Sequence, residues 1–460
     1  MYKFSIFIFR RDLRLDDNLG LLKALSASEK VIPCFILNPE QIEKNPFKGQ
    51  SSLNFMFESL EELNELLERK KSSLFIFKGI PSEIINDIYK EIKIDSIFIN
   101  REYTPFGIER DSLIQKTCRK LGIHLEEIED YLLNPLDSVS KKDFKPYKKF
   151  TPYYRVARKL PIQLPKKNNF KNYFKGSIKN SLKISEVKNI LNYKSNPLSI
   201  KGGRKNALEI FKQLEKFKNY SRDRDIPSYD LTTHLSPHHK FGTISVRESY
   251  YAIKEKLGAS HPLITQLYWR DFFTNIGFNF PHVLGKCFYE KYEKLKWENK
   301  SKFFNAWKNG LTGFPIVDAG MRELNGTGFM HNRVRMIVAS FLCKDLLIDW
   351  RKGEKYFAQH LTDYDPLVNN GNWQWAAGTG CDSVPYFRIF NPWLQQKKFD
   401  KDCKYIKKWI PELKNLEPKI IHNLHLFFPA DLKYPKPIID HTQRKKLTLK
   451  IYKRTSKSGF

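Results

Sequence analysis

Short apolar runs that alternate with helical patterns constrain the fold of this chain more than any other feature. Four runs of four to seven residues are nearly continuous in apolar side chains, as strands buried on both faces are. These runs are 3–9, 31–37, 74–77 and 96–99. Helical periodicity between them predicts helices over 52–69 and 81–92. Because strand and helix alternate, we predict an α/β domain with a doubly wound parallel sheet over 1–130.

The rest of the chain has a different pattern. Residues 131–200 are rich in Lys, Pro and Asn and predict a long connector. From 205 onward helical periodicity continues almost to the end, with helices predicted over 206–217, 245–257 and 333–350. We therefore predict an all-helical domain over 201–460. Two domains also suit a length of 460 residues, since single cores stop growing well before this size.

Several common classes are excluded by what the sequence lacks. The turn after the first apolar run, "RRDLRLDDN", has neither GxGxxG nor GxxxxGK[ST], so the usual phosphate-binding loop is absent there. The six cysteines form no CxxC pair, and His234, His238 and His239 have no carboxylate or thiol at ligand spacing, so we expect no metal site and a reducing compartment. No signal peptide and no apolar run of about 20 residues is present, so we expect a soluble cytoplasmic protein without membrane contact, with the nucleus and a virion left open.

The formal net charge of +30 favours a nucleic-acid partner. Part of this charge has a simpler source, because Lys, Asn and Ile are abundant throughout, as in a genome rich in A and T. Residues 141–180 are strongly basic, but they are equally typical of a solvated linker.

A possible phosphate site lies at 232–237. Ser236 followed by Pro237 predicts a helix start with Ser236 as its N-cap, and Thr232 and Thr233 add hydroxyls just before it. A helix N-terminus with nearby hydroxyls suits a pyrophosphate. An ordinary capped helix is the alternative.

Several sequence blocks together resemble the photolyase and cryptochrome flavoprotein family, and most closely a class I cyclobutane pyrimidine dimer photolyase. The blocks are FRRDLRLDDN (9–18), QLYWRDFF (266–273), TGFPIVDAGMREL (312–324), GFMHNRVRM (328–336), LTDYDPLVNNGNWQW (361–375), PYFRIFNP (385–392) and YPKPIIDH (434–441). The likeness covers essentially the whole chain and is densest from 220 to 395. It implies an antenna-type α/β domain followed by a helical, catalytic FAD-binding domain.

The resemblance implies FAD in the helical domain and light-driven electron transfer from the reduced flavin to a flipped-out pyrimidine dimer. The cofactor contacts carried over by motif are Tyr220, Thr232, Thr233, Leu235, Ser236, Trp269, Arg270, Asn332, Arg335, Asp363, Asp365 and Asn369. Asn369 falls near the flavin nitrogen that gains or loses a proton, and an amide can donate to or accept from that nitrogen.

Two tryptophans lie two positions apart in "NNGNWQWAAGTG" (369–380). Residues i and i+2 do not share a helix face, so Trp373 and Trp375 would project in different directions. The resemblance makes Trp373 the flavin-proximal member of an electron-transfer chain, with Trp350 in the middle and Trp297 at the surface end. It places Trp375 with Trp269 at the wall of the substrate cavity. Core packing is the alternative for each indole.

The expected partner is UV-damaged DNA that contains pyrimidine dimers, bound by a monomer. The residues carried over as substrate or DNA contacts are Arg224, Gln266, Trp269, Arg333, Met336, Trp375 and Arg388. The basic surface would hold the phosphates while aromatic side chains receive the flipped bases. For each of the three arginines, a structural ion pair is the alternative.

The type of dimer depends on three positions. Enzymes that repair cyclobutane dimers usually carry Glu where this chain has Gln266, which resembles (6-4) photolyases and animal cryptochromes. The (6-4) enzymes carry two histidines where this chain has Asn332 and Met336, and Met cannot perform the acid-base step of that repair. The missing histidine pair favours cyclobutane dimers, with a (6-4) photolyase as the alternative.

Two other functions are alternatives for this sequence. A cryptochrome photoreceptor without repair activity usually has a long extension, whereas this sequence ends about twenty residues after 434–441. A basic nucleic-acid-binding module explains the charge but not the flavin-site blocks. The family's α/β domain often holds a second, light-harvesting chromophore, a reduced folate or a deazaflavin, and the sequence does not show which one, if either, is bound here.

Overall fold

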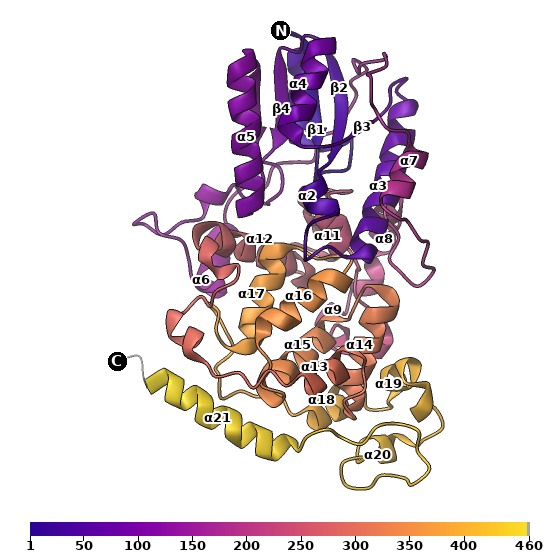
Figure 1. Cartoon of the computed structure of the whole chain (residues 1–460), viewed down its shortest axis with the longest axis vertical. Helices are drawn as coiled ribbons and strands as arrows, with labels where there is room; N and C mark the ends of the chain where they lie inside the picture. Colours follow the sequence, from indigo (N-terminus) through magenta and orange to yellow (C-terminus); the bar gives the residue numbers. More distant parts are fainter. Residues whose placement is uncertain (458–460) are drawn as a thin grey trace. The chain divides into compact units, whose positions relative to one another are not determined.

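The computed structural model describes residues 1–457, which form two compact units (Figure 1). The first unit comprises Met1–Glu215 together with His234–Pro281. The second comprises Lys216–Thr233 and the chain from His282 onward. Among residues 1–457, no helix combines the length and the apolar character needed to cross a lipid bilayer.

A five-stranded parallel sheet forms the centre of the first unit, with the strand order β3-β2-β1-β4-β5. Its strands are β1 (Tyr2–Phe9), β2 (Ser28–Leu37), β3 (Phe75–Lys78), β4 (Ser96–Asn100) and β5 (His124–Ile128). The predicted doubly wound sheet is confirmed. The sequence did not predict β5, because this edge strand, HLEEI, is polar and only partly buried.

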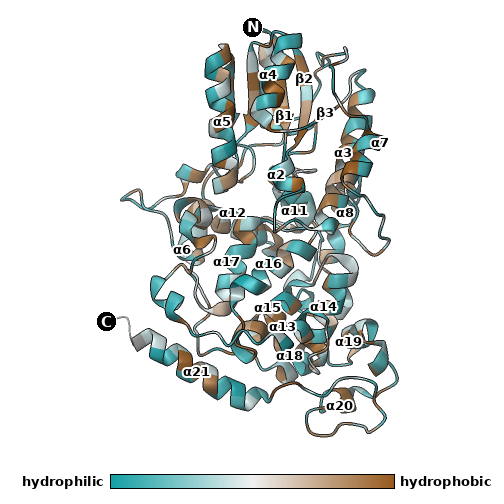
Figure 2. Ribbon diagram, in the orientation of Figure 1, coloured by the Kyte–Doolittle hydropathy of each residue, from teal (hydrophilic) through white to brown (hydrophobic). Residues whose placement is uncertain are grey.

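The apolar runs are continuous because helices cover both faces of the sheet. The helices between the strands are α1 (Leu19–Ala27), α2 (Pro39–Ile42), α3 (Gln50–Glu68), α4 (Pro81–Glu91) and α5 (Pro105–Leu121). On β1, Phe7 and Phe9 join one buried cluster, and Ile6 and Ile8 join another on the opposite face. Figure 2 shows the resulting mixture of apolar and polar segments on these helices.

Residues 131–200 pack within the first unit. They include α6 (Phe150–Ala157) and α7 (Ile184–Ile190), and Tyr173 and Leu182 make single β-bridges to the sheet. The unit continues with α8 (Arg204–Lys212), α10 (Ser236–Phe241), α11 (Val246–Leu257) and α12 (Pro262–Asn279). The domain boundaries at 130 and 200 stay predictions.

The second unit is helical throughout its described residues. Its helices are α9 (Tyr220–Asp223), α13 (Ser301–Lys308), α14 (Pro315–Thr327), α15 (Asn332–Ser340), α16 (Trp350–His360), α17 (Pro366–Ala377), α18 (Pro392–Phe399), α19 (Lys404–Trp409), α20 (Pro418–Ile421) and α21 (His441–Lys457). They surround one large apolar core, in which α17 packs against both α15 and α16.

The single helix predicted over 333–350 is wrong. The helix α15 ends at Ser340, a π-helical turn follows, and the chain reverses at Leu347, where φ is +51°. The helix α16 then begins at Trp350, and Asp349 caps it by accepting a hydrogen bond from the Arg351 N–H at 3.0 Å. The apolar periodicity of the sequence does not reveal the turn between α15 and α16, because the apolar residues of this turn are buried as fully as those of the helices.

Candidate functional site

The two tryptophans of α17 have different surroundings, as their spacing predicted. Trp373 is 2% exposed and packs edge-to-face against Phe357 at 4.9 Å between ring centroids and against Trp307 at 6.3 Å. Trp375 is only partly buried and lies at the edge of the same apolar core. One indole is therefore enclosed by protein, and the other is accessible to solvent or to a ligand.

Gly353 allows α16 to approach Trp373. A Cβ atom at this position would lie 2.2 Å from the Trp373 ring and 2.5 Å from Leu342. Only glycine fits such a close approach without displacing the indole or the helix. The sequence does not reveal the role of Gly353, because a single glycine within a helix does not indicate which residue it packs against.

The other two tryptophans of the predicted chain lie in the same core. Trp350 is fully buried in the first turn of α16, with the Arg351 guanidinium 5.0 Å from its ring centroid. Trp297 is partly buried and packs edge-to-face against Tyr452 at 6.5 Å. The three indoles thus range from buried to partly exposed within one cluster.

An ion pair joins two of the predicted flavin contacts. Arg335 on α15 donates from both terminal nitrogens to the two oxygens of Asp363, at 3.1 and 2.9 Å, and its Nε donates to the Met330 carbonyl at 2.7 Å. Asp365 is buried and caps α17, accepting from the N–H groups of Leu367 and Val368 at 3.0 and 3.1 Å. The Asp363 carboxylate is therefore held by the Arg335 guanidinium, and the Asp365 carboxylate by the backbone of α17.

Asn369 is oriented by the neighbouring helix. Its Nδ2 donates to the Glu354 carbonyl at 3.2 Å, and its backbone N–H donates to Asp365. The Glu354 side chain accepts from Asn370 at 2.8 Å, and burial raises the pKa of this carboxyl to about 7 although the Asn370 hydrogen bond opposes the shift. Glu354 of α16 and Asn369 and Asn370 of α17 thus form a polar cluster between the two helices.

The predicted DNA-contacting residues of the second unit do not share one environment. Arg333 donates to Asp225 at 2.8 Å and lies over the Phe399 ring, whereas Arg224 lies 3.9 Å from the same carboxylate. Arg388 is exposed. The structure therefore brings Arg224 and Arg333 together around Asp225.

Further predicted residues of this unit follow the helix geometry. The Asn332 amide lies 4.0 Å from the Met336 sulfur, one turn along α15. Tyr220 begins α9 and is buried beneath the Arg224 guanidinium, which lies 5.2 Å from its ring centroid. Thr232 and Thr233 are partly buried in the segment that follows.

The predicted N-cap at Ser236 is wrong by one position. The helix α10 begins at Ser236 itself, Leu235 occupies the cap position, and no side chain caps the helix there. Ser236 is exposed, and Leu235 is buried against Ala207 and Ile244. The Ser-Pro signal marked the helix start but could not separate the cap from the first turn.

In the first unit, α12 carries Gln266 and Trp269 on one face, because they are three residues apart. Trp269 stacks on Phe150 of α6 with 3.6 Å between ring centroids and an angle of 8° between the planes. Gln266 is partly buried and its amide lies 3.4 Å from the Pro262 carbonyl. Trp269 therefore already has one face covered by an aromatic ring.

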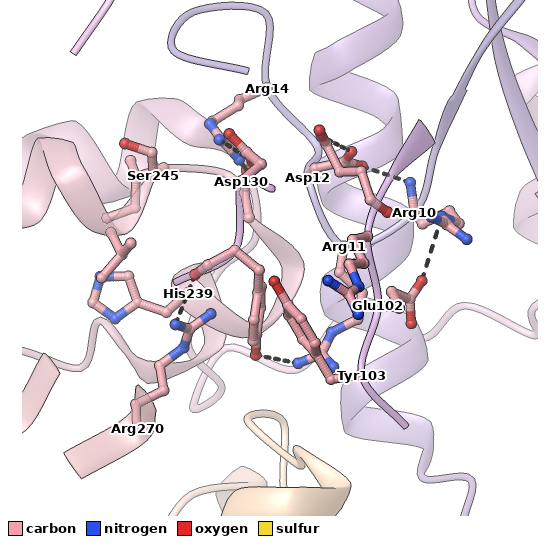
Figure 3. Close-up of a pocket in the computed structure, with 16 residues that line it drawn as sticks. Arg10, Arg11, Asp12, Arg14, Glu102, Tyr103, Asp130, His239, Ser245 and Arg270 are labelled. Carbon is pink, nitrogen blue, oxygen red and sulfur yellow. Dashed lines mark hydrogen bonds and ion pairs between the residues drawn. The ribbon is translucent and has the colours of Figure 1, made fainter. Parts of the chain in front are cut away.

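Arg270 makes contacts that favour a structural role. It donates to the Tyr131 carbonyl at 2.9 Å and to Asp271 at 3.2 Å, and its guanidinium stacks 3.5 Å from the Tyr131 ring centroid. Burial raises the pKa of Asp271 to about 7, although the Arg270 charge opposes the shift. Figure 3 shows Arg270 in a pocket that this unit forms.

That pocket lies where the strand order reverses between β1 and β4, a common ligand site in doubly wound sheets. Its five arginines are all engaged: Arg10 with Asp111, Arg11 with Tyr131, Arg14 with Asp130, Arg101 with Glu129 and Arg270 with Asp271. The remaining space is about 20 Å³, which admits one water molecule. The paired arginines therefore leave little enclosed space in this pocket.

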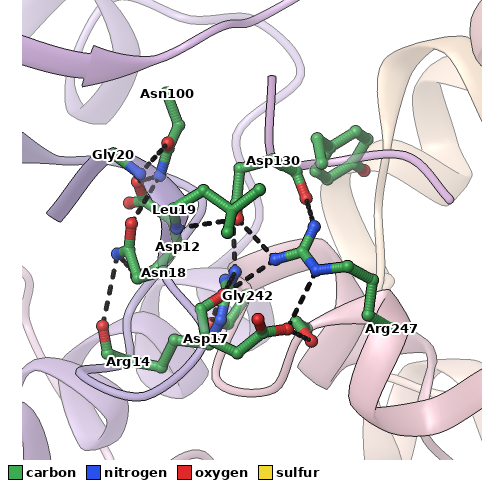
Figure 4. A network of polar contacts seen from close by, with 12 residues as sticks. Asp12, Arg14, Asp17, Asn18, Leu19, Gly20, Asn100, Asp130, Gly242 and Arg247 are labelled. Carbon is green, nitrogen blue, oxygen red and sulfur yellow. Dashed lines mark hydrogen bonds and ion pairs between the residues drawn. The ribbon is translucent and has the colours of Figure 1, made fainter. Parts of the chain in front are cut away.

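A buried ionic network lies next to the pocket (Figure 4). Arg247 donates to Asp17 at 3.0 Å and to Asp130 at 2.7 Å, and Arg14 also pairs with Asp130. Burial alone would raise the pKa of Asp130, but the Arg14 and Arg247 charges outweigh it and lower the pKa. The network joins the turn after β1 to α11 through side chains far apart in sequence.

Comparisons with known proteins agree over the whole chain. Residues 5–168 match the DNA photolyase family, and residues 263–454 match the family described as the FAD binding domain of DNA photolyase. The deoxyribodipyrimidine photo-lyase of Alkalihalophilus pseudofirmus is 36% identical, with 97% of each chain covered. The chain belongs to the DNA photolyase family.

Solved structures extend this agreement to the fold. An archaeal photolyase from Sulfolobus tokodaii, described with two FAD molecules, is 42% identical with a TM-score of 0.90, covering 98% of this chain and 100% of that one. A bacterial class III photolyase from Agrobacterium tumefaciens is 35% identical with a TM-score of 0.91, covering 99% and 98%. The predicted family, fold class, enzyme class and FAD cofactor are thereby confirmed, and light-dependent DNA repair follows as the activity of the family.

Proposed function

We propose that this photolyase splits cyclobutane pyrimidine dimers in DNA, as class I enzymes do, by light-driven electron transfer. The observation that carries the choice of dimer is the pair formed by Asn332 and Met336 on α15. Repair of a (6-4) product needs a side chain that transfers a proton near neutral pH. Neither an amide nor a thioether can do so, whereas splitting a cyclobutane ring does not need that step.

The described residues fit a flavin. In the second unit, Asn332, Arg335, Asp363 and Asn369 would hold it, because amide and guanidinium donors stand beside an apolar core on packed helices. When bound, FAD supplies the electron for repair after it absorbs blue or near-UV light. The contacts proposed for Tyr220, Thr232, Thr233, Leu235, Ser236, Trp269, Arg270 and Asp365 rest on the family likeness.

The three tryptophans provide a route for electrons within the second unit. Trp297 is partly exposed and can exchange electrons with solutes, whereas Trp350 and Trp373 are buried in the same core. Gly353 holds α16 against Trp373 and fixes the orientation of that ring. Buried indoles change their surroundings little on losing an electron, which suits stepwise transfer.

The residues proposed as substrate contacts are aromatic, polar or basic, and their grouping rests on the family likeness. Trp269 and Trp375 each offer a partly exposed indole for a flipped base, and Gln266 can donate a hydrogen bond to the dimer. Arg224, Arg333 and Arg388 would contact phosphates near the lesion. A damaged base pair stacks poorly, so flipping it costs less than flipping normal bases.

One observation favours a second candidate, the (6-4) photolyase. Gln266 brings no carboxyl proton, and this position usually carries Glu in enzymes for cyclobutane dimers. In the proposed reading the Gln266 amide substitutes for that carboxyl as a hydrogen-bond donor. We further propose that the enzyme acts as a cytoplasmic monomer and that any second chromophore, a reduced folate or a deazaflavin, binds elsewhere than in the arginine-lined pocket.

The proposal is tested with purified enzyme and a duplex that carries one cyclobutane thymine dimer. Wild-type enzyme should restore the thymines under blue light and not in the dark. Trp373→Phe should lose photoreduction of oxidised flavin but keep repair when the flavin is reduced chemically. Unchanged photoreduction in Trp373→Phe would remove this residue from the route, and no light-dependent repair by wild-type enzyme would overturn the proposed function.

A further inference from the structure

The helix α21 divides its side chains between a buried face and a cationic face. The buried residues are His441, Thr448, Tyr452 and Thr455. The exposed cations, here named the cationic face, are Lys445, Lys446, Lys450, Lys453 and Arg454. At 100° per residue these five fall within one half of the helix circumference. Residues 441–457 include no Asp or Glu.

The buried face fixes α21 to the core of the second unit. The Tyr452 hydroxyl donates to the Ala377 carbonyl at the end of α17, at 2.7 Å. His441 and Asp345 form a hydrogen bond of 2.5 Å. Arg444, which lies outside the cationic face, pairs with Glu298 at 2.8 Å. The helix that carries the cationic face is therefore held rigidly.

A groove leads from Arg388 to this face. Its volume is about 410 Å³, and its lining includes Leu394 and Gln395 of α18 and Thr442 and Lys445 of α21. Arg388 and Lys445 supply positive charge, and the rest of the lining is polar or apolar. One surface thus connects a predicted DNA-contacting arginine with the cationic face.

The cations of this face have no acidic neighbours. Among the described residues, no carboxylate lies within 4.0 Å of any of the five charged groups, in contrast to Arg444. Five like charges on one helix face repel one another unless a polyanion compensates them. From Lys445 to Arg454 the helix rises by about 13 Å, which is comparable to about four base-pair steps along the duplex axis at a rise of roughly 3.4 Å each.

We propose that the cationic face of α21 and the adjoining groove bind the sugar-phosphate backbone of duplex DNA beside the lesion. This inference rests on the proposed function only in taking DNA as the substrate. The cationic face would add phosphate contacts to those of Arg224, Arg333 and Arg388. It recognises no sequence, because phosphate contacts carry none.

The test is dark binding of intact holoenzyme to undamaged 24-bp and 8-bp duplexes over a range of salt concentrations. In the triple variant Lys445→Gln, Lys446→Gln and Lys450→Gln, the slope of log K against log salt on the 24-bp duplex should become shallower by about 2 to 3, since each lost phosphate contact removes about 0.9. On the 8-bp duplex the change should be smaller, because a short duplex offers fewer phosphates to the cationic face and the groove together.

The matched control removes three exposed cations from α5 of the first unit, in the variant Lys116→Gln, Arg119→Gln and Lys120→Gln. This control should bind the 24-bp duplex with nearly the wild-type slope. A wild-type slope in the α21 variant, or an equal change in both variants, would overturn the proposal. The proposal would also be overturned if the α21 variant lost binding to phosphatidylserine vesicles without any loss of DNA binding.

Two further measurements separate this proposal from the proposed function. The repair rate at saturating DNA should be the same in the α21 variant and the wild type, because the cationic face touches neither flavin nor dimer. Suppose that the wild type repairs no dimer but the slope of log K against log salt is still shallower in the α21 variant. The proposed function then fails and this inference stands. If repair is normal and the salt dependence is unchanged, only this inference fails.

Discussion

The buried network of the first unit and the cationic face of the second unit use basic residues in opposite ways. In the network, Arg14 and Arg247 are buried, and each pairs with a buried carboxylate. The cations of α21 are exposed, whereas the buried core of the same unit holds Trp350 and Trp373. A net charge of +30 therefore does not show by itself where DNA binds. Burial and pairing separate the arginines that hold the fold from the cations that are available to a partner.

The largest expected effect comes from the buried network. Arg247→Met should lower the free energy of unfolding by about 3–5 kcal/mol, because the buried Asp17 would lose its arginine partner and the buried Asp130 would lose one of its two. Urea denaturation measures this change. The control Lys446→Met should change stability by less than about 0.5 kcal/mol. Similar losses in the two variants would break the comparison.

A buried carboxyl of the second unit should show a pH effect. The folded-state pKa of Glu354, about 7, lies above its ordinary value of 4.5, so the folded protein binds more protons between these values and stability falls as pH rises through this range. Glu354→Gln should remove about 1–3 kcal/mol of this fall. Denaturation midpoints measured from pH 5 to pH 8 test it, and parallel pH profiles for variant and wild type would contradict it.

The packing of Trp373 predicts a smaller change. Gly353→Ala should cost about 1–3 kcal/mol, since its Cβ would lie 2.2 Å from the indole. The tryptophan fluorescence spectrum should shift at the same time. The control Gly326→Ala on α14 has only a Trp409 carbon at 3.8 Å and should be neutral or stabilising. Equal stability changes in the two variants would show that α16 can shift away from Trp373 without lowering the free energy of unfolding.

The smallest stability effect is expected for Arg333, which is more exposed than Arg247 and less exposed than the cationic face of α21. Arg333→Gln should cost at most about 1 kcal/mol, because its pair with Asp225 is partly exposed, and should weaken DNA binding several-fold. Arg322 forms a comparable pair with Glu412 and is not a predicted DNA contact. Arg322→Gln should therefore cost similar stability and leave DNA affinity unchanged. Equal affinities of the two variants would assign Arg333 to the fold alone.

The sequence predicted β1 to β4 because burial on both faces leaves continuous apolar runs. It missed β5, whose edge position allows the charged sequence HLEEI, and it joined α15 to α16 because the turn at Leu347 is as apolar as the helices. The different directions of Trp373 and Trp375 follow from local spacing. The partners of Arg247 do not, since Asp17 and Asp130 lie more than a hundred residues away along the chain.

The candidate site was predicted mainly through family resemblance. The spacing of Asn332, Arg335 and Met336 on one helix face could be read from the sequence, and so could the different directions of Trp373 and Trp375. The contact between Gly353 and Trp373 could not, because it depends on how two helices pack. The residue roles stay proposals until the variants are measured.

The most direct test of the central claim is product analysis after blue illumination of fully reduced enzyme with two oligonucleotides. One carries a cyclobutane thymine dimer and the other a (6-4) product, and each has a dark control. We expect light-dependent restoration of the cyclobutane dimer only, with Gln266 serving as a sufficient hydrogen-bond donor. Restoration of the (6-4) product, or of neither lesion by protein that still photoreduces its flavin, would contradict it.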